Sequence, residues 1–244
     1  PAFYVYLFDY NTGALLSIMN GSALGQIRTG AASGIATKYL SRQDATKLSI
    51  IGTGYQAKTQ AESIDLIRSI KLIKVYSRSD ENRKIFAQWV TKKLKIECIP
   101  VNSSAECIED TDIITTITTS RKPVIEGRFI QPGTHLNAAG GNHYTRRELD
   151  DDAVLNCDLI VTDDIHQARV ECGDLIGVID RGLVQWQNIH QMSDIVSGRK
   201  KGRNNNNQIT LFESQGLAIQ DLTAATQIYS KAIQQKIGKT VNIN

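Results

Sequence analysis

Two glycines and an alanine stand at a spacing that suits the binding of a diphosphate. Gly52, Gly54 and Ala57 directly follow a short apolar run that ends at Ile51. In a strand–turn–helix unit the first glycine permits the tight turn, the second lets the backbone approach a ligand, and the small third residue lets the helix pack closely on the strand. The N–H groups and the dipole at the start of such a helix attract phosphate. The spacing therefore predicts a dinucleotide-binding turn with these candidate contacts: Gly52, Thr53, Gly54, Tyr55, Gln56 and Ala57.

The residues at the end of the next predicted strand indicate which dinucleotide is preferred. NAD-binding folds usually carry an Asp or Glu there, which accepts hydrogen bonds from the ribose 2′-hydroxyl. This chain has Ser77, Arg78 and Ser79 instead. A carboxylate would repel a 2′-phosphate, whereas the Arg78 guanidinium can bind one and stack on adenine. We therefore expect NADP to be preferred. The alternative is that Arg78 faces solvent and that the protein uses either cofactor.

Two charged residues outside the turn could act on a substrate. Arg28 precedes a helix of small residues, where its guanidinium would suit a carboxylate or a phosphate, and the predicted helix N-terminus at Thr29 and Gly30 would be a second anion site. Asp221 lies about one turn into an otherwise apolar helix. A carboxylate among apolar neighbours has a raised pKa and can exchange protons near neutrality. Taken alone, each residue fits a solvent-facing role at least as well.

The elements that must position these residues alternate between strands and helices, as expected of a doubly wound, mostly parallel α/β sheet of the Rossmann type. Strands are predicted at residues 47–51, 70–77, 96–100, 112–118, 133–139, 159–163 and 209–212. Helices are predicted at residues 58–69, 79–93, 103–108, 165–180, 187–197 and 216–236. The alternative is an ordinary glycine turn in another α/β protein.

The first residues predict a hairpin, with strands at residues 1–9 and 14–19 and a turn between them. A hairpin alone is only marginally stable. The chain also lacks an initiator Met. We therefore expect an N-terminal portion that precedes Pro1.

Composition excludes several classes of protein. The 244 residues carry a formal net charge of only +3, which does not favour binding to nucleic acid or to an anionic membrane. No apolar run approaches the length of a membrane span, and the first residues do not show the pattern of a signal peptide. The four cysteines show no metal-ligand spacing, so we expect no metal site, buried free thiols and a cytoplasmic location. The basic residues 199–203 are expected to form a solvated loop.

Several motifs follow one another along the chain in a specific order. They are Arg28-Thr29-Gly30-Ala31-Ala32, Gly52-Thr53-Gly54-Tyr55-Gln56-Ala57, Pro132-Gly133-Thr134-His135-Leu136-Asn137, Arg147-Glu148-Leu149-Asp150, Glu171-Cys172-Gly173-Asp174-Leu175 and Ser214-Gln215-Gly216-Leu217-Ala218-Ile219-Gln220-Asp221. Each motif is modest, but the ordered set resembles the ornithine cyclodeaminase/mu-crystallin family. The resemblance covers essentially the whole chain.

The resemblance implies two lobes and a homodimer. Residues 1–27 would be the remnant of a smaller, truncated α+β lobe for substrate and dimerisation, residues 28–213 the NAD(P)-binding lobe, and residues 214–244 a helix that returns to the smaller lobe. Family members oxidise amino acids or reduce cyclic and linear imines with NAD(P), and one branch deaminates ornithine to proline with bound NAD. The family also grips its substrate with a Lys and an Arg from strands that would precede Pro1, so independent catalysis by this chain is an open question.

The resemblance also implies roles for single residues. Arg28 would meet the substrate carboxylate, and Asp221 would be the catalytic carboxylate. Beyond the glycine turn and residues 77–79, the cofactor contacts would be Thr29, Thr116, Thr118, Asn137, Ala139 and Ser214. We expect His135 to be a packed core residue. His143 is a weaker candidate for the site, and Glu171 and Asp174 are expected to orient their loop.

The leading hypothesis is an NADP-preferring imine reductase or amino-acid dehydrogenase that acts on a small amino or imino acid. The alternatives are an ornithine cyclodeaminase, which would release ammonia, and a non-catalytic, crystallin-like nucleotide-binding protein. The absence of an acid at Ser77 counts against the cyclodeaminase.

Overall fold

A computed structural model describes residues 3–241 of the chain, which divide into two compact units. Unit 1 combines the residues up to Arg28 with those from Leu217 onward, and unit 2 comprises Thr29–Gly216. The division falls one residue after the first predicted boundary and three residues after the second. The helix α1 (Ser22–Leu40) runs from unit 1 into unit 2.

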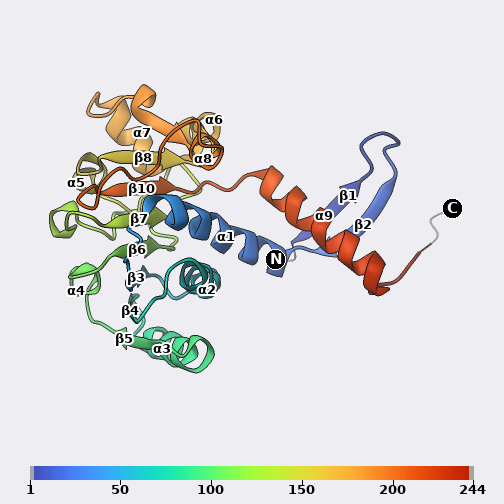
Figure 1. The fold of residues 1–244 in the computed structure, drawn as a ribbon, viewed down its shortest axis with the longest axis horizontal. Coiled ribbons are helices and arrows are strands. Elements are labelled where there is room, and N and C mark those ends of the chain that lie inside the picture. The colour runs from blue at the N-terminus through green and yellow to red at the C-terminus, as the bar shows by residue number, and fades with distance from the viewer. Residues whose placement is uncertain (1–2, 242–244) are drawn as a thin grey trace. The chain divides into compact units, whose positions relative to one another are not determined.

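Unit 2 is built on one parallel sheet, which within the described residues has eight strands in the order β5-β4-β3-β6-β7-β10-β8-β9 (Figure 1). The strands are β3 (Lys47–Ile51), β4 (Leu72–Tyr76), β5 (Glu97–Pro100), β6 (Ile113–Thr116), β7 (His135–Ala138), β8 (Leu159–Thr162), β9 (Ile189–Gln191) and β10 (Thr210–Glu213). The direction in which successive strands are added to the sheet reverses between β3 and β6, which pair with each other. Ligands of open α/β sheets bind at such a switch point, beyond the carboxyl ends of the strands.

Helices cover both faces of this sheet, and Figure 1 shows α2 and α3 on the opposite side from α4 and α5. The helices are α2 (Ala57–Ile67), α3 (Asp80–Leu94), α4 (Ser104–Ile108), α5 (Asp151–Leu155), α6 (Ile165–Glu171), α7 (Gly173–Asp180) and α8 (Met192–Val196), with 3₁₀ turns at Gly127–Phe129 and Trp186–Asn188. The predicted α/β fold class is therefore confirmed.

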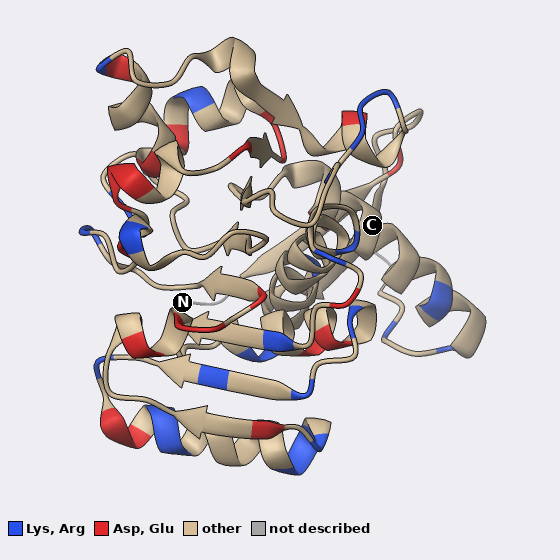
Figure 2. Ribbon diagram, turned by 60° about the vertical axis from the view of Figure 1, so that its left-hand side comes forward, with Lys and Arg blue, Asp and Glu red and all other residues tan. Residues whose placement is uncertain are grey.

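The central strands are buried on both sides and carry aliphatic side chains toward both faces of the sheet. Side chains alternate across a strand, so Ile113 packs into the cluster under α2 and α3, while its neighbour Ile114 packs into the cluster under α5 and α7. In β3, Ile50 packs into the cluster under α2 and α3, and Ile51 packs into the cluster under α5 and α7. Each fully buried aliphatic side chain of this kind stabilises the fold by roughly 1.5–3 kcal/mol. Figure 2 shows that charged residues lie mostly on helices and loops and seldom on strands.

Three sequence-based element predictions were wrong. The predicted helix 165–180 is two helices, because Cys172 has a non-helical backbone (ψ 90°) between α6 and α7. The predicted helix 187–197 is a 3₁₀ turn, the edge strand β9 and the short α8. The helix α1 begins at Ser22, so Thr29 and Gly30 lie inside it and offer no helix N-terminus to an anion.

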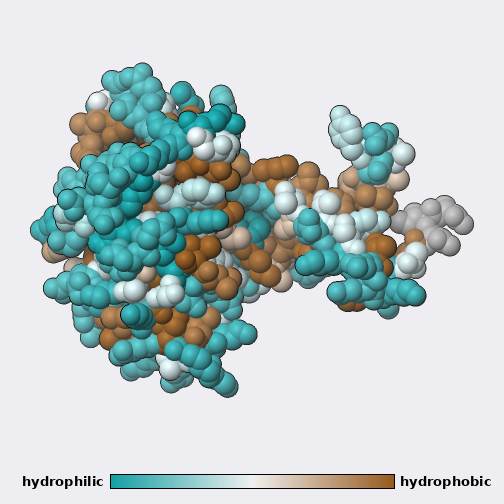
Figure 3. Space-filling model, viewed as in Figure 1, coloured by the Kyte–Doolittle hydropathy of each residue, from teal (hydrophilic) through white to brown (hydrophobic). Residues whose placement is uncertain are grey.

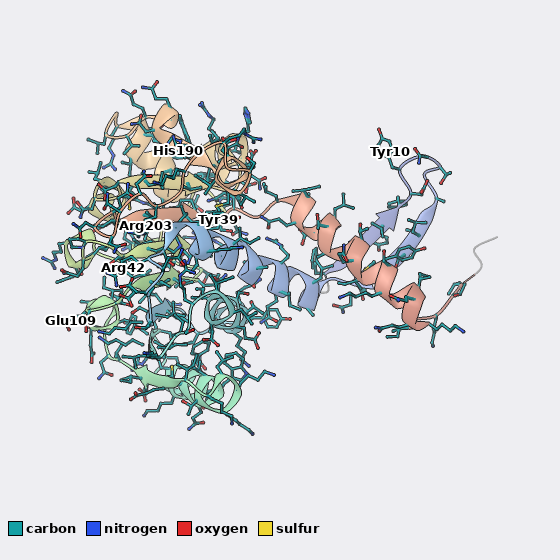
Figure 4. All side chains as sticks on the ribbon, in the orientation of Figure 1. Tyr10, Tyr39, Arg42, Glu109, His190 and Arg203 are labelled. Atoms are coloured by element: carbon teal, nitrogen blue, oxygen red, sulfur yellow. The ribbon has the colours of Figure 1, made fainter. Side chains whose placement is uncertain are left out.

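Unit 1 contains the predicted hairpin and the last helix. The strands β1 (Tyr4–Phe8) and β2 (Leu15–Asn20) pair antiparallel, and α9 (Ala218–Gln235) packs against β1. The Asp9 carboxylate closes the turn by accepting the backbone N–H of Thr12 at 2.8 Å. Tyr10 stands 98 % exposed at this turn (Figure 4). Figure 3 shows hydrophobic residues at the surface of this unit as well as of unit 2.

The basic segment at residues 199–203 is only partly the solvated loop that was expected. Arg199, Lys200 and Lys201 are exposed, but the Arg203 guanidinium is half-buried and donates to the backbone carbonyl of Leu40 at 2.6 Å. Figure 4 shows Arg203 close to Tyr39, whose carbonyl accepts the Arg203 backbone N–H at 3.2 Å. Arg203 therefore fastens this loop to the end of α1.

Within the described residues, no helix combines the length and apolar character needed to cross a membrane. The cysteines Cys98, Cys107, Cys157 and Cys172 are all free thiols. Cys107 and Cys172 are buried, as predicted, whereas Cys98 and Cys157 are only partly buried.

Candidate functional site

The turn after β3 has a backbone that only glycine adopts without strain. Gly52 has φ +112°, and a Cβ there would stand 2.4 Å from the carbonyl oxygen of Ile117. Its N–H donates to the carbonyl of Tyr76 at 2.8 Å, which joins the ends of β3 and β4. The first glycine of the motif is therefore fixed by both conformation and space.

The second glycine faces open space. A Cβ on Gly54 would meet no atom within 4 Å among the described residues. The helix α2 begins three residues later, at Ala57, which is completely buried against the sheet. Its N-cap Gln56 makes no side-chain capping bond within the described part of the chain, whereas Ser79 caps α3 by accepting the Asn82 N–H. This combination of open space and an uncapped helix start fits a bound diphosphate.

A pocket of about 270 Å³ opens at this turn. Its walls come from the turn after β3, the end of β4 and the segment after β6. The lining residues are Ile51, Gly52, Thr53, Gly54, Tyr76, Ser77, Arg78, Ile117, Thr118, Thr119, Ser120 and Val124. The predicted cofactor contacts that line it are Gly52, Thr53, Gly54, Ser77, Arg78 and Thr118. Thr119, Ser120 and Val124 were not among the predicted contacts, because the sequence gives no pattern for the path of this segment.

A hydrogen bond joins two parts of the pocket wall, the turn after β3 and the end of β4. The Thr53 hydroxyl donates to the Ser77 hydroxyl at 2.9 Å. Behind them, the buried Arg83 donates to the Ser77 carbonyl at 2.6 Å and lies over the Tyr76 ring. Arg78 lines the pocket with an exposed side chain. A cation at this place is free to meet an anionic group on a ligand.

Several predicted contacts lie elsewhere in unit 2. Asn137 is buried in the core, where its amide donates to the Thr37 hydroxyl at 3.1 Å and its oxygen faces His135 Nε2 at 3.2 Å. Ala139 and Ser214 follow β7 and β10, and the Ser214 N–H donates to the carbonyl of Ala138 at 2.9 Å. The remaining members of this group are outside the pocket lining: Thr29, Tyr55, Gln56, Ala57, Ser79 and Thr116.

The segment after β6 is held by a residue for which the sequence suggested no role. The Glu148 carboxylate is completely buried and accepts the Thr116 hydroxyl at 2.8 Å and the Thr118 N–H at 2.6 Å. It also accepts the Gly140 N–H at 2.8 Å. Desolvation raises the pKa of Glu148, and these hydrogen bonds oppose the rise. Only the motif at residues 147–150 pointed to this position, and nothing in it indicated what the carboxylate binds.

Two more buried carboxyl groups lie near Glu148. Asp174 accepts the backbone N–H groups of Glu148 and Leu149, each at 2.9 Å, and so holds the loop at these residues. That Asp174 and Glu171 orient their own loop, residues 171–174, stays a prediction. Burial raises the pKa of Asp174, and the charge of Glu148 adds to the rise. Burial also raises the pKa of Glu213, at the end of β10, well above its usual value, and the nearby Asp174 adds to this. Neither carboxyl oxygen of Glu213 has a hydrogen-bond partner within residues 3–241.

Unit 1 contains the two residues predicted to handle the substrate. The Arg28 guanidinium donates from Nε to the Asp221 carboxylate at 3.0 Å, and from Nη1 to the side-chain oxygen of Gln220 at 3.2 Å. The Arg28 and Asp221 side chains are each 23 % exposed, so both remain reachable by a solute. Asp221 therefore has a cationic partner rather than the purely apolar surroundings that the sequence suggested.

The other candidate residues have structural partners. His135 is fully buried between Thr210 and Asn137, and desolvation lowers its pKa to about 3, so it is a neutral core residue as predicted. His143 is exposed, contacts Thr145 at 2.9 Å and stacks on Tyr144. Within the described residues, no His, Cys, Asp and Glu side chains group together as metal ligands would.

Comparison with known proteins gives the family of the chain. The sequence model of the ornithine cyclodeaminase/mu-crystallin family matches residues 2–236. The chain belongs to this family. The predicted resemblance is therefore confirmed.

Relatives within the family include enzymes of known name. The chain is 38 % identical over 238 residues to a delta(1)-pyrroline-2-carboxylate reductase of Bacillus cereus, a match that covers 97 % of this chain and 73 % of the relative. The structure of the Thermococcus litoralis delta(1)-pyrroline-2-carboxylate reductase, solved with NADH and L-proline, is 41 % identical and superposes with a TM-score of 0.96 over 98 % of this chain and 74 % of that one. An archaeal alanine dehydrogenase dimer with bound NAD is 31 % identical, with a TM-score of 0.93 over 100 % and 75 % of the two chains.

Proposed function

We propose that this chain is a nicotinamide-dependent oxidoreductase that interconverts a small imino acid and the corresponding amino acid. The observation that carries the proposal is the pocket at Gly52–Gly54, with its open approach at Gly54 and its uncapped helix start, in a member of this family. The named relatives are reductases and dehydrogenases, and the solved ones hold NADH or NAD. A nicotinamide dinucleotide is therefore the cofactor class that the proposal requires.

The chain's own residues would bind the cofactor and move the proton. The turn at residues 52–57 would hold the diphosphate, and Ser77 and Arg78 the adenosine ribose. The cofactor, when bound, supplies or accepts the hydride. Arg28 would bind the substrate carboxylate and thereby fix the position of its Cα. In the reducing direction the C=N double bond gains a hydride at Cα and a proton at nitrogen, and Asp221 would deliver that proton.

The substrate class follows from the same residues and from the relatives. A guanidinium such as Arg28 selects a carboxylate, and a neighbouring carboxylate such as Asp221 attracts a basic nitrogen. Relatives are named for pyrroline-2-carboxylate and alanine, and one structure contains L-proline. We infer that cyclic imino acids with a carboxylate at the imine carbon, and their saturated amino acids, are the compounds to test first.

A substrate screen tests this proposal. The full protein is incubated with NADPH or NADH and each of several cyclic imines, and in reverse with L-proline and other α-amino acids, while nucleotide absorbance is recorded. At least one imino acid should consume reduced nucleotide, and Asp221→Asn should lower turnover by about a hundredfold or more while nucleotide affinity stays unchanged. Ammonia release from ornithine without net change in absorbance would favour a cyclodeaminase instead, and binding without any turnover would favour a non-catalytic protein.

NADP is proposed as the preferred nucleotide on the basis of Arg78. This residue lines the pocket beside Ser77, where an acid would repel a 2′-phosphate. Replacing Arg78 with Gln should weaken NADPH binding by about tenfold, because a charge-assisted contact is lost, and should leave NADH binding within about twofold. Equal effects on both nucleotides would contradict this assignment.

We also propose a cellular location and an oligomeric state for the protein. Free cysteines, two of them buried and two partly buried, suit a reducing compartment, and nicotinamide-dependent metabolism of amino acids suits the cytoplasm. We infer a homodimer from the family and from the dimeric archaeal alanine dehydrogenase.

A further inference from the structure

We propose that Glu148 is a positioning residue that holds one wall of the cofactor pocket in its binding conformation. The proposal rests on the proposed function, since it assigns Glu148 to the binding of a nicotinamide dinucleotide. The wall is the segment at residues 117–124, which follows β6. Its pocket-lining members are Ile117, Thr118, Thr119, Ser120 and Val124.

The carboxylate of Glu148 holds the start of this wall. One oxygen accepts the Thr118 N–H at 2.6 Å, and the other accepts the Thr116 hydroxyl and the Gly140 N–H, each at 2.8 Å. The side chain is completely buried. Hydrogen bonds from main-chain N–H groups to a buried carboxylate are short and strong. They fix the backbone of Thr118 and also join the ends of β6 and β7.

The main chain of Glu148 holds the other end of the wall. Its carbonyl oxygen accepts the N–H of Val124 at 2.8 Å and that of Ile125 at 3.0 Å. Both ends of the segment are thus attached to one residue. Glu148 itself is not among the residues that line the pocket, so it acts on a ligand through the wall.

Further contacts hold Glu148 in place. Asp174 accepts the N–H groups of Glu148 and Leu149, each at 2.9 Å. At Gly140 a Cβ would stand 2.7 Å from the Glu148 carboxylate and 2.2 Å from the carbonyl of Thr118, so only glycine lets the carboxylate approach this closely. The carboxylate therefore has a single well-defined position.

The consequence for binding is preorganisation. A loop that is ordered only when its ligand binds lowers affinity by the free energy of ordering it. A wall that is already fixed by Glu148 avoids that cost, and its residues meet the nucleotide in place. Loss of the carboxylate should weaken nucleotide binding even though no atom in contact with the nucleotide changes.

The experiment compares Glu148→Gln with wild type by titration of NADPH and NADH, followed by nucleotide fluorescence. Glutamine keeps the size of the side chain but replaces one acceptor oxygen with an NH₂ group that faces an N–H donor. The dissociation constants should rise about tenfold or more. The control is Asp112→Asn: this carboxylate accepts the N–H groups of Thr46 and Lys47 at 2.7 and 2.9 Å where β3 and β6 begin, away from the pocket. It should leave the constants within about twofold.

A second measurement on the wild-type protein keeps the proposal testable if Glu148→Gln does not fold. Amide hydrogen exchange is followed at residues 117–124 without nucleotide. A wall held by Glu148 is protected before any nucleotide is added. Free exchange that becomes slow only with NADPH would overturn the proposal, and so would unchanged dissociation constants in a folded Glu148→Gln. Failure of the wild type to bind either nucleotide would overturn the proposed function instead. In that case, amide hydrogen exchange at residues 117–124 without nucleotide would still decide whether Glu148 holds the wall.

Discussion

At the scale of single residues, Glu213 is in unfavourable surroundings for a charge. It lies at the carboxyl end of β10 with 1 % of its surface exposed, and neither carboxyl oxygen has a hydrogen-bond partner within the described chain. Burial disfavours the ionised form and the nearby charge of Asp174 adds to this, so the pKa of Glu213 is raised well above 4.5. The group is therefore protonated in the folded protein at pH values where the unfolded chain has released that proton.

This difference predicts a pH dependence of stability. Above about pH 5 the folded state binds more protons than the unfolded state, so the free energy of unfolding falls as the pH rises, by up to about 1.4 kcal/mol per pH unit for one group. Glu213→Gln removes the titrating group, and the fall should become shallower by about that amount. Urea unfolding of both proteins between pH 5 and pH 8 checks this. Parallel curves for the two proteins would contradict it.

At the scale of elements, the sequence predicted the strands better than the helix boundaries. Strands such as β3 and β6 are recognised from their isoleucine, leucine and threonine residues, because β-branched and aliphatic side chains are enriched in buried strands. The start of α1 at Ser22 and the break at Cys172 were missed, and the break depends on a tertiary contact. A Cβ on Gly173 would stand 2.1 Å from the carbonyl of Arg146, a contact with no local signature in the sequence.

In the site, too, the features formed by residues close together in the sequence were predicted, and those formed by distant segments were not. The glycine turn and the end of β4 lie close together in the sequence, and their role in the pocket was predicted. The wall at residues 117–124 and its support by Glu148 were not, because these segments meet only in the folded sheet. Asp221 was expected among apolar neighbours, but Arg28, far away in the sequence, lies at 3.0 Å.

The packing of α1 on α2 yields a prediction at this scale. A Cβ on Gly30 would stand 2.4 Å from the backbone carbonyl of Thr59, whereas one on Gly177, in α7, would meet no described atom within 4 Å. Gly30→Ala should therefore lower the free energy of unfolding by about 1–3 kcal/mol. Gly177→Ala is the control and should raise it by about 0.5–1 kcal/mol. Urea unfolding measures both, and equal effects would show that α1 and α2 are not in close contact at Gly30.

For the whole molecule, unit 1 presents apolar side chains that its own elements leave uncovered. Tyr6, Phe8 and Ile18 of the hairpin are each more than half exposed. A hollow of about 760 Å³ lies between β2 and the end of α9, and apolar residues contribute much of its lining. Exposed apolar patches of this kind favour association. The inferred homodimer would give them a partner surface.

Light scattering after size-exclusion chromatography tests this inference. A homodimer should have twice the chain mass of 27.0 kDa. Replacing Tyr6 and Phe8 with Ser should shift the mass toward that of one chain without changing the nucleotide affinity of unit 2. A single-chain mass for the wild type at micromolar concentration would contradict the dimer.

The measurement that tests the central claim most directly is nucleotide binding by Gly54→Val. The claim is that a nicotinamide dinucleotide binds at the turn after β3, against the open side of Gly54. A Cβ there would meet no described atom within 4 Å, so we expect the variant to unfold at nearly the same temperature as the wild type. The valine side chain would occupy the space of the diphosphate. We predict that the dissociation constant for NADPH rises at least a hundredfold with an unchanged melting temperature. A variant that binds NADPH as tightly as the wild type would contradict the account.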